Sequence, residues 1–139
     1  MSIRQFALAD TEAVVALWEV CGLVRPWNDP RMDIERKLQV QPELFLVVED
    51  DGAVVGSAMV GYDGHRGWIN YLAVAPTHRR LGIARALVTR AEDELLQRGC
   101  PKLNLQVRAG NEAALAFYRG IGYVEDGAIG LGKRLIPDD

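Results

Sequence analysis

The chain has 139 residues, of which 49% are hydrophobic and 25% charged, and it carries a formal net charge of −3. A chain of this length is expected to form one domain and to bury about 65–70% of the surface of its unfolded state. No apolar run approaches the roughly 18 residues that a membrane-spanning helix needs, and residues 1–6 lack the apolar core of a signal peptide. We therefore expect a cytoplasmic protein with no membrane partner.

The composition also argues against two kinds of site. Cys21 and Cys100 have neither metal-ligand spacing nor the density of a disulfide framework, and the two histidines add too little for a metal site. The negative net charge argues against a nucleic-acid partner. The basic residues between His78 and Arg85 form a local positive spot, which suits a small anion better than a duplex.

In the first half of the chain, the pattern predicts a strand, two helices and three consecutive strands. The first strand covers residues 2–6, and the first helix begins after Asp10 as its N-cap and stops at Cys21-Gly22. A proline-bounded loop precedes a polar helix over residues 33–38. Three hairpin-connected strands are then predicted, over residues 44–49, 53–62 and 68–74. The last of these is apolar on both faces, so we expect it near the centre of the sheet.

In the second half, a long amphipathic helix is the clearest element. The remaining predictions are a helix over 82–98 closed by Gly99, a strand over 103–107, a helix from Asn111 to Gly120 or Gly122, and a final hairpin of 123–124 with 129–135.

The most informative segment runs from Val74 to Ala84, where an apolar strand ends at Pro76 and a basic loop opens the long helix. The first four N–H groups of a helix have no internal acceptor, and the helix dipole places partial positive charge there, so a phosphate satisfies both. Gly82 lets a ligand approach the backbone closely, and the small Ala84 leaves the first turn unshielded. We therefore expect an anion site at this helix start.

The stretch Arg79-Arg80-Leu81-Gly82-Ile83-Ala84 matches the pattern Arg/Gln-x-x-Gly-x-Gly/Ala. It resembles the acyl-CoA-binding loop of the GCN5-related N-acetyltransferase (GNAT) family. The order of predicted elements resembles the family's α/β (α+β) fold, a mixed, mostly antiparallel central sheet flanked by about four helices. The resemblance implies a single GNAT acetyltransferase domain over residues 1–139, with acetyl-CoA as co-substrate and its pyrophosphate at this loop. The implied pyrophosphate contacts are Arg79, Arg80, Gly82, Ile83 and Ala84; for the two arginine side chains, solvent exposure is the alternative.

The resemblance also assigns roles to the strand before the loop. In the family this strand diverges from the next one, and its exposed backbone groups pair with the pantetheine arm of the cofactor. The corresponding edge here is Leu72, Ala73 and Val74. The alternative is a fully paired central strand, although Pro76 shows that pairing must end there.

A second segment, Asn111 followed by Leu115 to Tyr123, looks like the family's N…A…FY…GY/F segment. This implies that Asn111 contacts the cofactor and that the Tyr118 hydroxyl lies near the cofactor sulfur. The alternatives are a plain helix N-cap and a core aromatic. A phenol with a pKa near 10 is neutral at pH 7 and can donate a proton to a departing thiolate, whose conjugate acid has a pKa of about 8–9.

The general base is harder to identify. Many relatives carry a glutamate on one of two strands, where this chain has Asn70, Tyr71 and Gln106. The segment from Leu105 to Asn111 looks like that of the ribosomal-protein N-terminal alanine acetyltransferases, except that Gln106 replaces their catalytic glutamate. The alternatives for the base are a water chain, Tyr71, or one of the carboxylates Asp29, Asp33 and Asp63.

The loop between the first two helices is expected to wall the acceptor pocket. Trp27 can offer a flat apolar wall beside Arg25, although a lid over the core is the alternative. This loop and residues 61–67 look like those of the YpeA-type bacterial acetyltransferases. The resemblance as a whole implies an N-acetyltransferase in which a primary amine, preferably of a small molecule, attacks acetyl-CoA directly in a ternary complex. Protein or peptide N-terminal acetylation and a non-catalytic acyl-CoA sensor are the alternatives, and the chain is expected to be a monomer or homodimer.

Overall fold

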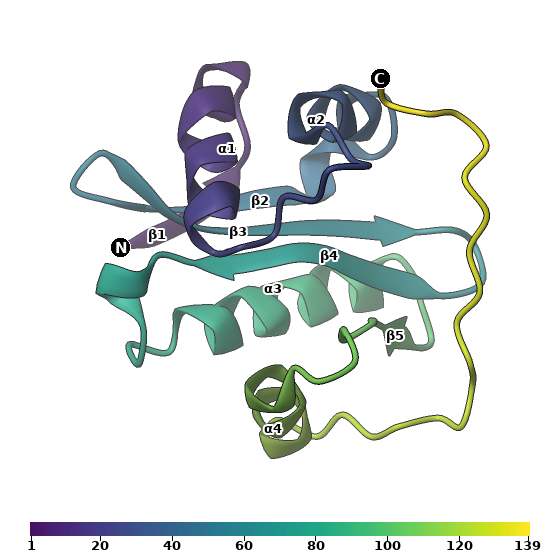
Figure 1. Cartoon of the computed structure of the whole chain (residues 1–139). Helices are drawn as coiled ribbons and strands as arrows, with labels where there is room; N and C mark the ends of the chain where they lie inside the picture. Colours follow the sequence, from purple (N-terminus) through teal and green to yellow (C-terminus); the bar gives the residue numbers. More distant parts are fainter.

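The computed structural model describes all residues, 1–139, and places a five-stranded sheet between two layers of helices (Figure 1). The strands follow chain order; β1 to β4 are antiparallel neighbours and β5 runs parallel to β4. The strands are β1 (Ser2–Gln5), β2 (Phe45–Asp50), β3 (Ala53–Tyr62), β4 (Gly67–Val74) and β5 (Leu103–Asn104). The helices are α1 (Thr11–Val20), α2 (Pro30–Leu38), α3 (Ile83–Gln97) and α4 (Glu112–Gly120). The predicted mixed, mostly antiparallel architecture is thus confirmed.

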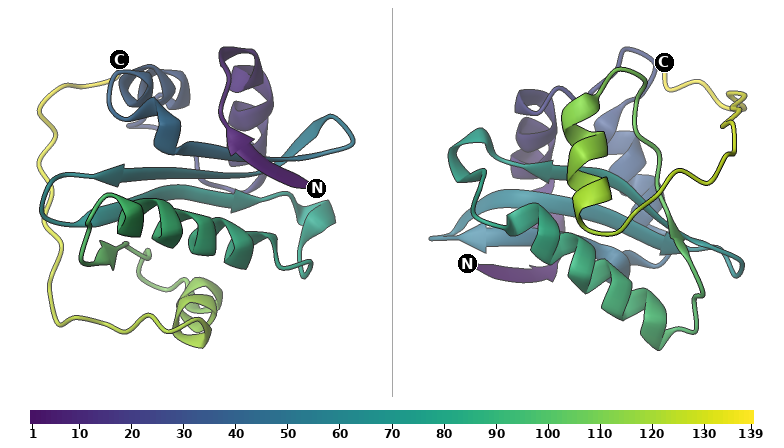
Figure 2. Two further views of the ribbon diagram at one scale, coloured as in Figure 1. Left: turned by 180° about the vertical axis from the view of Figure 1, so that it is seen from behind. Right: turned by 90° about the horizontal axis from the view of Figure 1, so that it is seen from below.

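The two helical layers divide the core into two apolar clusters. Helices α1 and α2 cover one face of the sheet, and α3 and α4 lie on the other (Figures 1 and 2). Along β2, Leu46 and Val48 join the cluster under α3, while Phe45 and Val47 join the cluster under α1 and α2. Side chains of a strand alternate between faces, so a strand between two helical layers must be apolar throughout. This explains the continuous apolar run in β2.

The start of each N-terminal helix differs from its prediction. Asp10 stands directly before α1, but its carboxylate accepts from Arg4 at 2.8 and 3.0 Å and from the Ala7 N–H at 2.8 Å instead of capping the helix. Helix α2 begins three residues earlier than predicted, because Asp29 caps it and Pro30 occupies its first position, where the missing N–H costs nothing.

The C-terminal part of the chain contradicts the predicted strands. The expected strand over 103–107 pairs only at Leu103 and Asn104, and neither 123–124 nor 129–135 forms a strand. A two-residue strand offers a short edge for pairing, and three glycines between 127 and 132 weaken any extended pairing there. The chain beyond α4 instead runs as an irregular tail along the side of the molecule and ends beside α2 (Figure 1). No helix has both the length and the apolar composition needed to cross a membrane.

Candidate active site

A β-bulge in β4 organises the centre of the candidate site. Ser57 of β3 pairs with Ala73, whereas Met59 pairs with Asn70, so Tyr71 and Leu72 together lie opposite Ala58. Tyr71 takes up the extra length with a left-handed φ of +52°, which is rare for a residue with a large side chain. The Tyr71 ring consequently packs on the α1 and α2 face, while Leu72 packs on the α3 face.

Beyond its first two residues, β4 has one edge without a partner strand. Pairing with β5 stops after Trp68, so the residues from Ile69 to Val74 face no strand on that side. An unpaired strand edge presents N–H and C=O groups to a ligand that can add to the sheet. The edge predicted to take the pantetheine arm, including Leu72, Ala73 and Val74, lies in this stretch.

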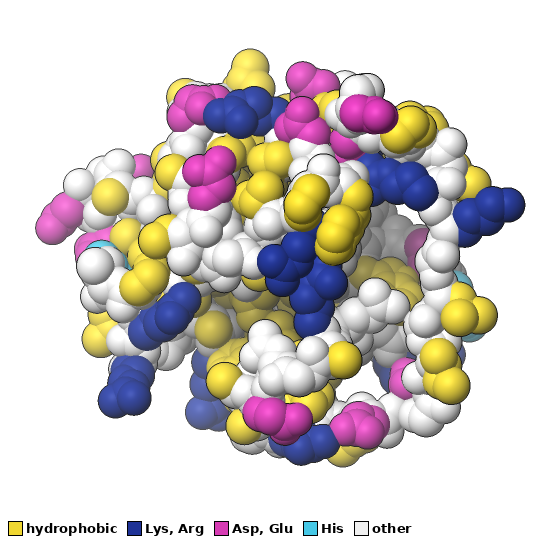
Figure 3. All heavy atoms as spheres, viewed as in Figure 1, with side chains coloured by type: hydrophobic (Ala, Val, Ile, Leu, Met, Phe, Trp, Pro, Cys, Tyr) yellow, Lys and Arg dark blue, Asp and Glu magenta, His cyan; other side chains and the backbone are white.

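The loop that follows β4 presents free backbone N–H groups. Those of Arg79, Arg80, Leu81 and Gly82 donate to no protein group, and the first turn of α3 has by geometry no internal acceptors for its own. Arg80 and Gly82 both have left-handed backbones, with φ of +64° and +78°. Such backbone, followed by a helix N-terminus, forms an anion-binding concavity. Lys and Arg side chains gather beside this loop (Figure 3).

The two loop arginines behave differently. The Arg79 side chain folds back, and its Nε donates to the Val74 carbonyl at 3.4 Å, close to the Cys21 sulfur. The Arg80 side chain is exposed. The fold therefore offers a ligand mainly main-chain donors at this loop, with Arg80 as an exposed cation.

Helix α4 brings the second predicted segment to the α3 side of the open edge. Tyr118 is half-buried between Phe117 and Tyr123, whose rings lie edge-on to it with centroids 5.0 and 5.8 Å away. Burial alone raises the pKa of Tyr118 to about 12, so its hydroxyl keeps its proton at neutral pH. The Asn111 side chain accepts from the Ala114 N–H at 3.1 Å and thus caps α4, which was one of its two predicted roles.

On the opposite face, Tyr71 lies in a polar network between α1 and α2. Its ring stacks on Trp18 with centroids 3.8 Å apart, and its hydroxyl donates to Asp33 Oδ2 at 2.6 Å. Burial and the Asp33 carboxylate raise the pKa of Tyr71 well above its usual value. The fully buried Ser57 accepts from the Trp18 indole at 2.9 Å and donates to the Tyr71 carbonyl at 2.8 Å, which ties α1 to the bulge.

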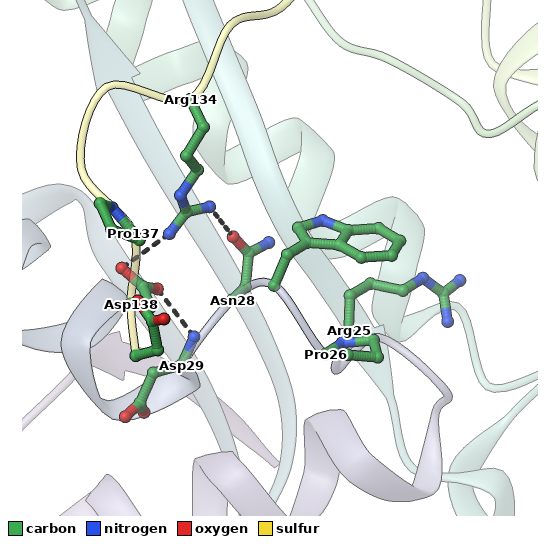
Figure 4. A pocket seen from close by; sticks show the side chains of 9 residues that line it. Arg25, Pro26, Asn28, Asp29, Arg134, Pro137 and Asp138 are labelled. Atoms are coloured by element: carbon green, nitrogen blue, oxygen red, sulfur yellow. Dashed lines mark hydrogen bonds and ion pairs between the residues drawn. The ribbon is translucent and has the colours of Figure 1, made fainter.

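A cavity of about 580 Å³ lies between the α1–α2 loop and the end of the tail (Figure 4). Asp138 closes one end of it: its carboxylate accepts from the Asp29 N–H at 2.8 Å, from Arg36 at 2.7 Å and from Arg134 at 2.6 Å. These donors hold the pKa of Asp138 well below its usual value. The surface is visibly hollowed between the body of the molecule and the tail (Figure 3).

Arg25 and Trp27, the two residues predicted to wall an acceptor pocket, both line this cavity. Trp27 is 55% exposed and therefore does not cover the core. The Arg108 guanidinium lies 5.8 Å from the centre of its ring, so the loop after β5 reaches the α1–α2 loop across the open edge of β4.

Comparison with known proteins identifies the fold. The model of the acetyltransferase (GNAT) family matches residues 11–123. The chain belongs to the GNAT acetyltransferase family. It is 56% identical over 138 residues to an acetyltransferase of Yersinia enterocolitica, covering 99% of this chain and 98% of that protein. It is an acetyl-CoA-dependent N-acetyltransferase.

Two solved structures show the same GNAT architecture. A structure of the enzyme AAC(6')-Iy with a bisubstrate analogue, CoA-S-monomethyl-acetylneamine, superposes with a TM-score of 0.78 at 18% identity, covering 97% of this chain and 98% of that one. The ribosomal-protein-S18-alanine N-acetyltransferase of Escherichia coli gives a TM-score of 0.71 at 25% identity, covering 87% of this chain and 76% of the other. At 18% identity, the similarity to AAC(6')-Iy supports a common fold and nothing more.

The GNAT fold brings some of the predicted acceptor residues together and separates others. Tyr71 and Asp33 are in contact, but Asp29 caps α2, and Asp63 accepts from two N–H groups of its own turn. Gln106 is exposed and lies against Gly130 of the tail, and Asn70 is exposed on β4. Sequence reasoning missed Arg36, Arg108, Arg134 and Asp138, because no local pattern signals contacts that join α2 and the loops to the tail or to one another.

Proposed function

We propose that this acetyltransferase is a single-domain enzyme that transfers the acetyl group from acetyl-CoA to a primary amine, by direct attack in a ternary complex. The observation that carries the proposal is the run of free N–H groups before α3 at the end of the open β4 edge. A diphosphate fits the loop, because a Cβ at Gly82 would meet no protein atom within 4 Å and the N–H groups there lack acceptors.

The residues that would hold the cofactor are those the resemblance names. Arg79, Arg80, Gly82, Ile83 and Ala84 would surround the diphosphate, Arg79 through its backbone N–H. The backbone of Leu72, Ala73 and Val74 would pair with the pantetheine arm. Asn111 keeps its side-chain N–H₂ free while its oxygen caps α4. When bound, acetyl-CoA supplies an activated acetyl thioester.

We propose Tyr118 as the group that stabilises the departing sulfur. With a pKa of about 12, its phenol holds its proton more tightly than a thiol of pKa about 8–9. The hydroxyl therefore donates a hydrogen bond to the developing thiolate, and the sulfur receives its proton only when Tyr118 is resupplied. A phenylalanine at this position has no hydrogen to donate.

A small-molecule acceptor is favoured by the cavity of about 580 Å³, which lies within the usual size range of small-ligand sites. AAC(6')-Iy, which shares this fold, is an aminoglycoside N-acetyltransferase, and an aminoglycoside is a small molecule. Peptide N-terminal acetylation is the weaker alternative, because Gln106 stands where the similar ribosomal-protein N-terminal alanine acetyltransferases carry their catalytic glutamate.

The test is thiol release from acetyl-CoA with lysine, spermidine, an aminoglycoside and a peptide with a free N-terminus as acceptors. We expect turnover with a small amine, and we expect Tyr118→Phe to lower kcat about 100-fold while the Kd for CoA stays unchanged. Tyr62→Phe removes a hydroxyl whose one hydrogen bond is a 3.4 Å bond to the Gly64 carbonyl, and it serves as the control. Absence of turnover with every amine would refute the proposed reaction, and turnover with the peptide alone would refute the small-molecule acceptor.

A further inference from the structure

The ring, hydroxyl and backbone carbonyl of Tyr71 are each fixed by a separate contact. Its ring stacks on Trp18, its hydroxyl donates to Asp33 at 2.6 Å, and its carbonyl accepts from Ser57. Its left-handed φ of +52° is a strained backbone for a tyrosine. Strain of this kind persists only where the surroundings fix it, and it concentrates at functional sites.

The position of Tyr71 places its hydroxyl on the acceptor side of the open edge. Tyr71 and Leu72 are the two bulge residues, and the backbone of Leu72 belongs to the edge without a partner strand. Tyr118 packs with the cluster under α3, whereas Tyr71 packs with the cluster under α1 and α2. The two phenols therefore lie on opposite faces of the sheet.

A chain of polar contacts joins Tyr71 to the cavity. Asp33 pairs with Arg36 at 3.2 Å, Arg36 pairs with Asp138, and Asp138 accepts from the backbone N–H of Asp29. The charged groups that act on the Tyr71 hydroxyl are thus Asp29 and Asp33 from α2 and its cap, and Asp138 from the tail, while Arg36 pairs with Asp33 and Asp138. Helix α1 contributes the neutral Trp18.

We propose that Tyr71 and Asp33 form the proton relay that deprotonates the acceptor ammonium, an inference that rests on the proposed acetyl transfer. Tyr71 Oη accepts a proton from the ammonium while its own proton passes to Asp33 Oδ2. The phenol is neutral before and after this step, so no buried phenolate forms. The Asp33 side chain is 22% exposed and releases the proton to water.

In the complete reaction the acceptor nitrogen loses two protons, one before and one after it bonds to the acetyl carbon. The ammonium loses its first proton through Tyr71 to Asp33, and the amine nitrogen then forms a bond to the acetyl carbon. As the carbon–sulfur bond breaks, Tyr118 passes its proton to the sulfur, and the second proton of the nitrogen replaces it on the Tyr118 oxygen. The products are an amide, the free thiol and one proton released to water.

The test compares Tyr71→Phe and Asp33→Asn with the Tyr62→Phe control, using the amine from the panel with the highest turnover. Tyr71→Phe keeps the ring on Trp18, and Asp33→Asn keeps the side-chain size. We expect kcat/KM at pH 7 to fall about 100-fold in both variants. The deficit should shrink to about fivefold or less at pH 10, where a far larger share of the amine is already deprotonated than at pH 7. A deficit that does not change with pH, or no deficit, would overturn the relay.

A second measurement needs no substrate. In an ultraviolet titration of the free protein, Asp33→Asn should lower the pH at which one tyrosine ionises, and the added Tyr71→Phe change should abolish this shift. An unchanged titration would show that the two side chains do not interact and would overturn the relay. If the wild type turns over, Tyr118→Phe is slow and Tyr71→Phe keeps the wild-type pH profile, the relay fails and the proposed function stands. If the wild type acetylates no amine, both fail.

Discussion

Gly82 and Gly99 provide a matched pair for testing the anion site. They flank the two ends of α3, both have a φ of +78°, and at neither would a Cβ meet a protein atom within 4 Å. An alanine at either position therefore brings the same backbone strain and no clash. Only Gly82 lies beside the free N–H groups of the loop.

The two effects can be estimated separately. Placing an alanine in the left-handed region costs about 1–2 kcal/mol, so both variants should lose that much unfolding free energy. In Gly82→Ala the added methyl and any relaxation of φ also disturb the N–H groups that face the diphosphate. Hydrogen bonds to a charged group contribute about 1.5–3 kcal/mol, so loss of one predicts CoA binding weakened about 10- to 150-fold.

Urea unfolding and isothermal titration calorimetry with CoA measure the two quantities. We expect equal destabilisation of Gly82→Ala and Gly99→Ala, with weaker CoA binding in Gly82→Ala alone. If both variants bind CoA as the wild type does, the diphosphate does not bind at this loop and the argument for the site is wrong.

Two further predictions concern the network around the site. Ser57→Ala should lower the unfolding free energy by about 1–3 kcal/mol, because the Trp18 indole loses its acceptor and the Tyr71 carbonyl loses a donor. Urea unfolding measures this loss, with Ser2→Ala at an exposed position as the control. Arg4 holds the pKa of Asp10 below its ordinary value, so this pair stabilises the fold above pH 4 and the stabilisation disappears as the pH falls below it. Asp10→Asn should flatten the loss of stability between pH 4 and pH 2; an unchanged slope would contradict the assignment.

The elements that depend on local signals could be predicted from the sequence. Gly22 and Gly99 end α1 and α3 with left-handed backbones, and Asp51-Gly52 forms the predicted turn between β2 and β3. These positions work through their own backbone preferences, which tertiary contacts do not override. The loop from Arg79 to Gly82 belongs to the same class, because its geometry follows from a strand end, a glycine and a helix start.

Features that depend on partners distant in sequence could not be predicted. Asp10 has the residue type of an N-cap, yet Arg4 of β1 takes its carboxylate. The alternating pattern over 103–107 is typical of a strand, but a strand needs a paired neighbour. Here β4 is that neighbour, and its pairing with β5 ends at Trp68 and Asn104. The contact between Tyr71 and Asp33 joins residues 38 positions apart and depends on where α2 begins.

The bulge explains how one strand can serve both faces of the sheet. In a regular strand Ile69, Tyr71 and Ala73 would point to one face. Ile69 instead lies in the cluster under α3, while Tyr71 and Ala73 lie with the cluster under α1 and α2, so the alternation is interrupted once, at the bulge. Without the extra residue, the Tyr71 ring would point away from Trp18 and Asp33. The bulge that turns Tyr71 toward Trp18 and Asp33 also lies in the part of β4 that β5 leaves unpaired. A single local irregularity thus places the proposed base on a strand that also offers the proposed cofactor edge.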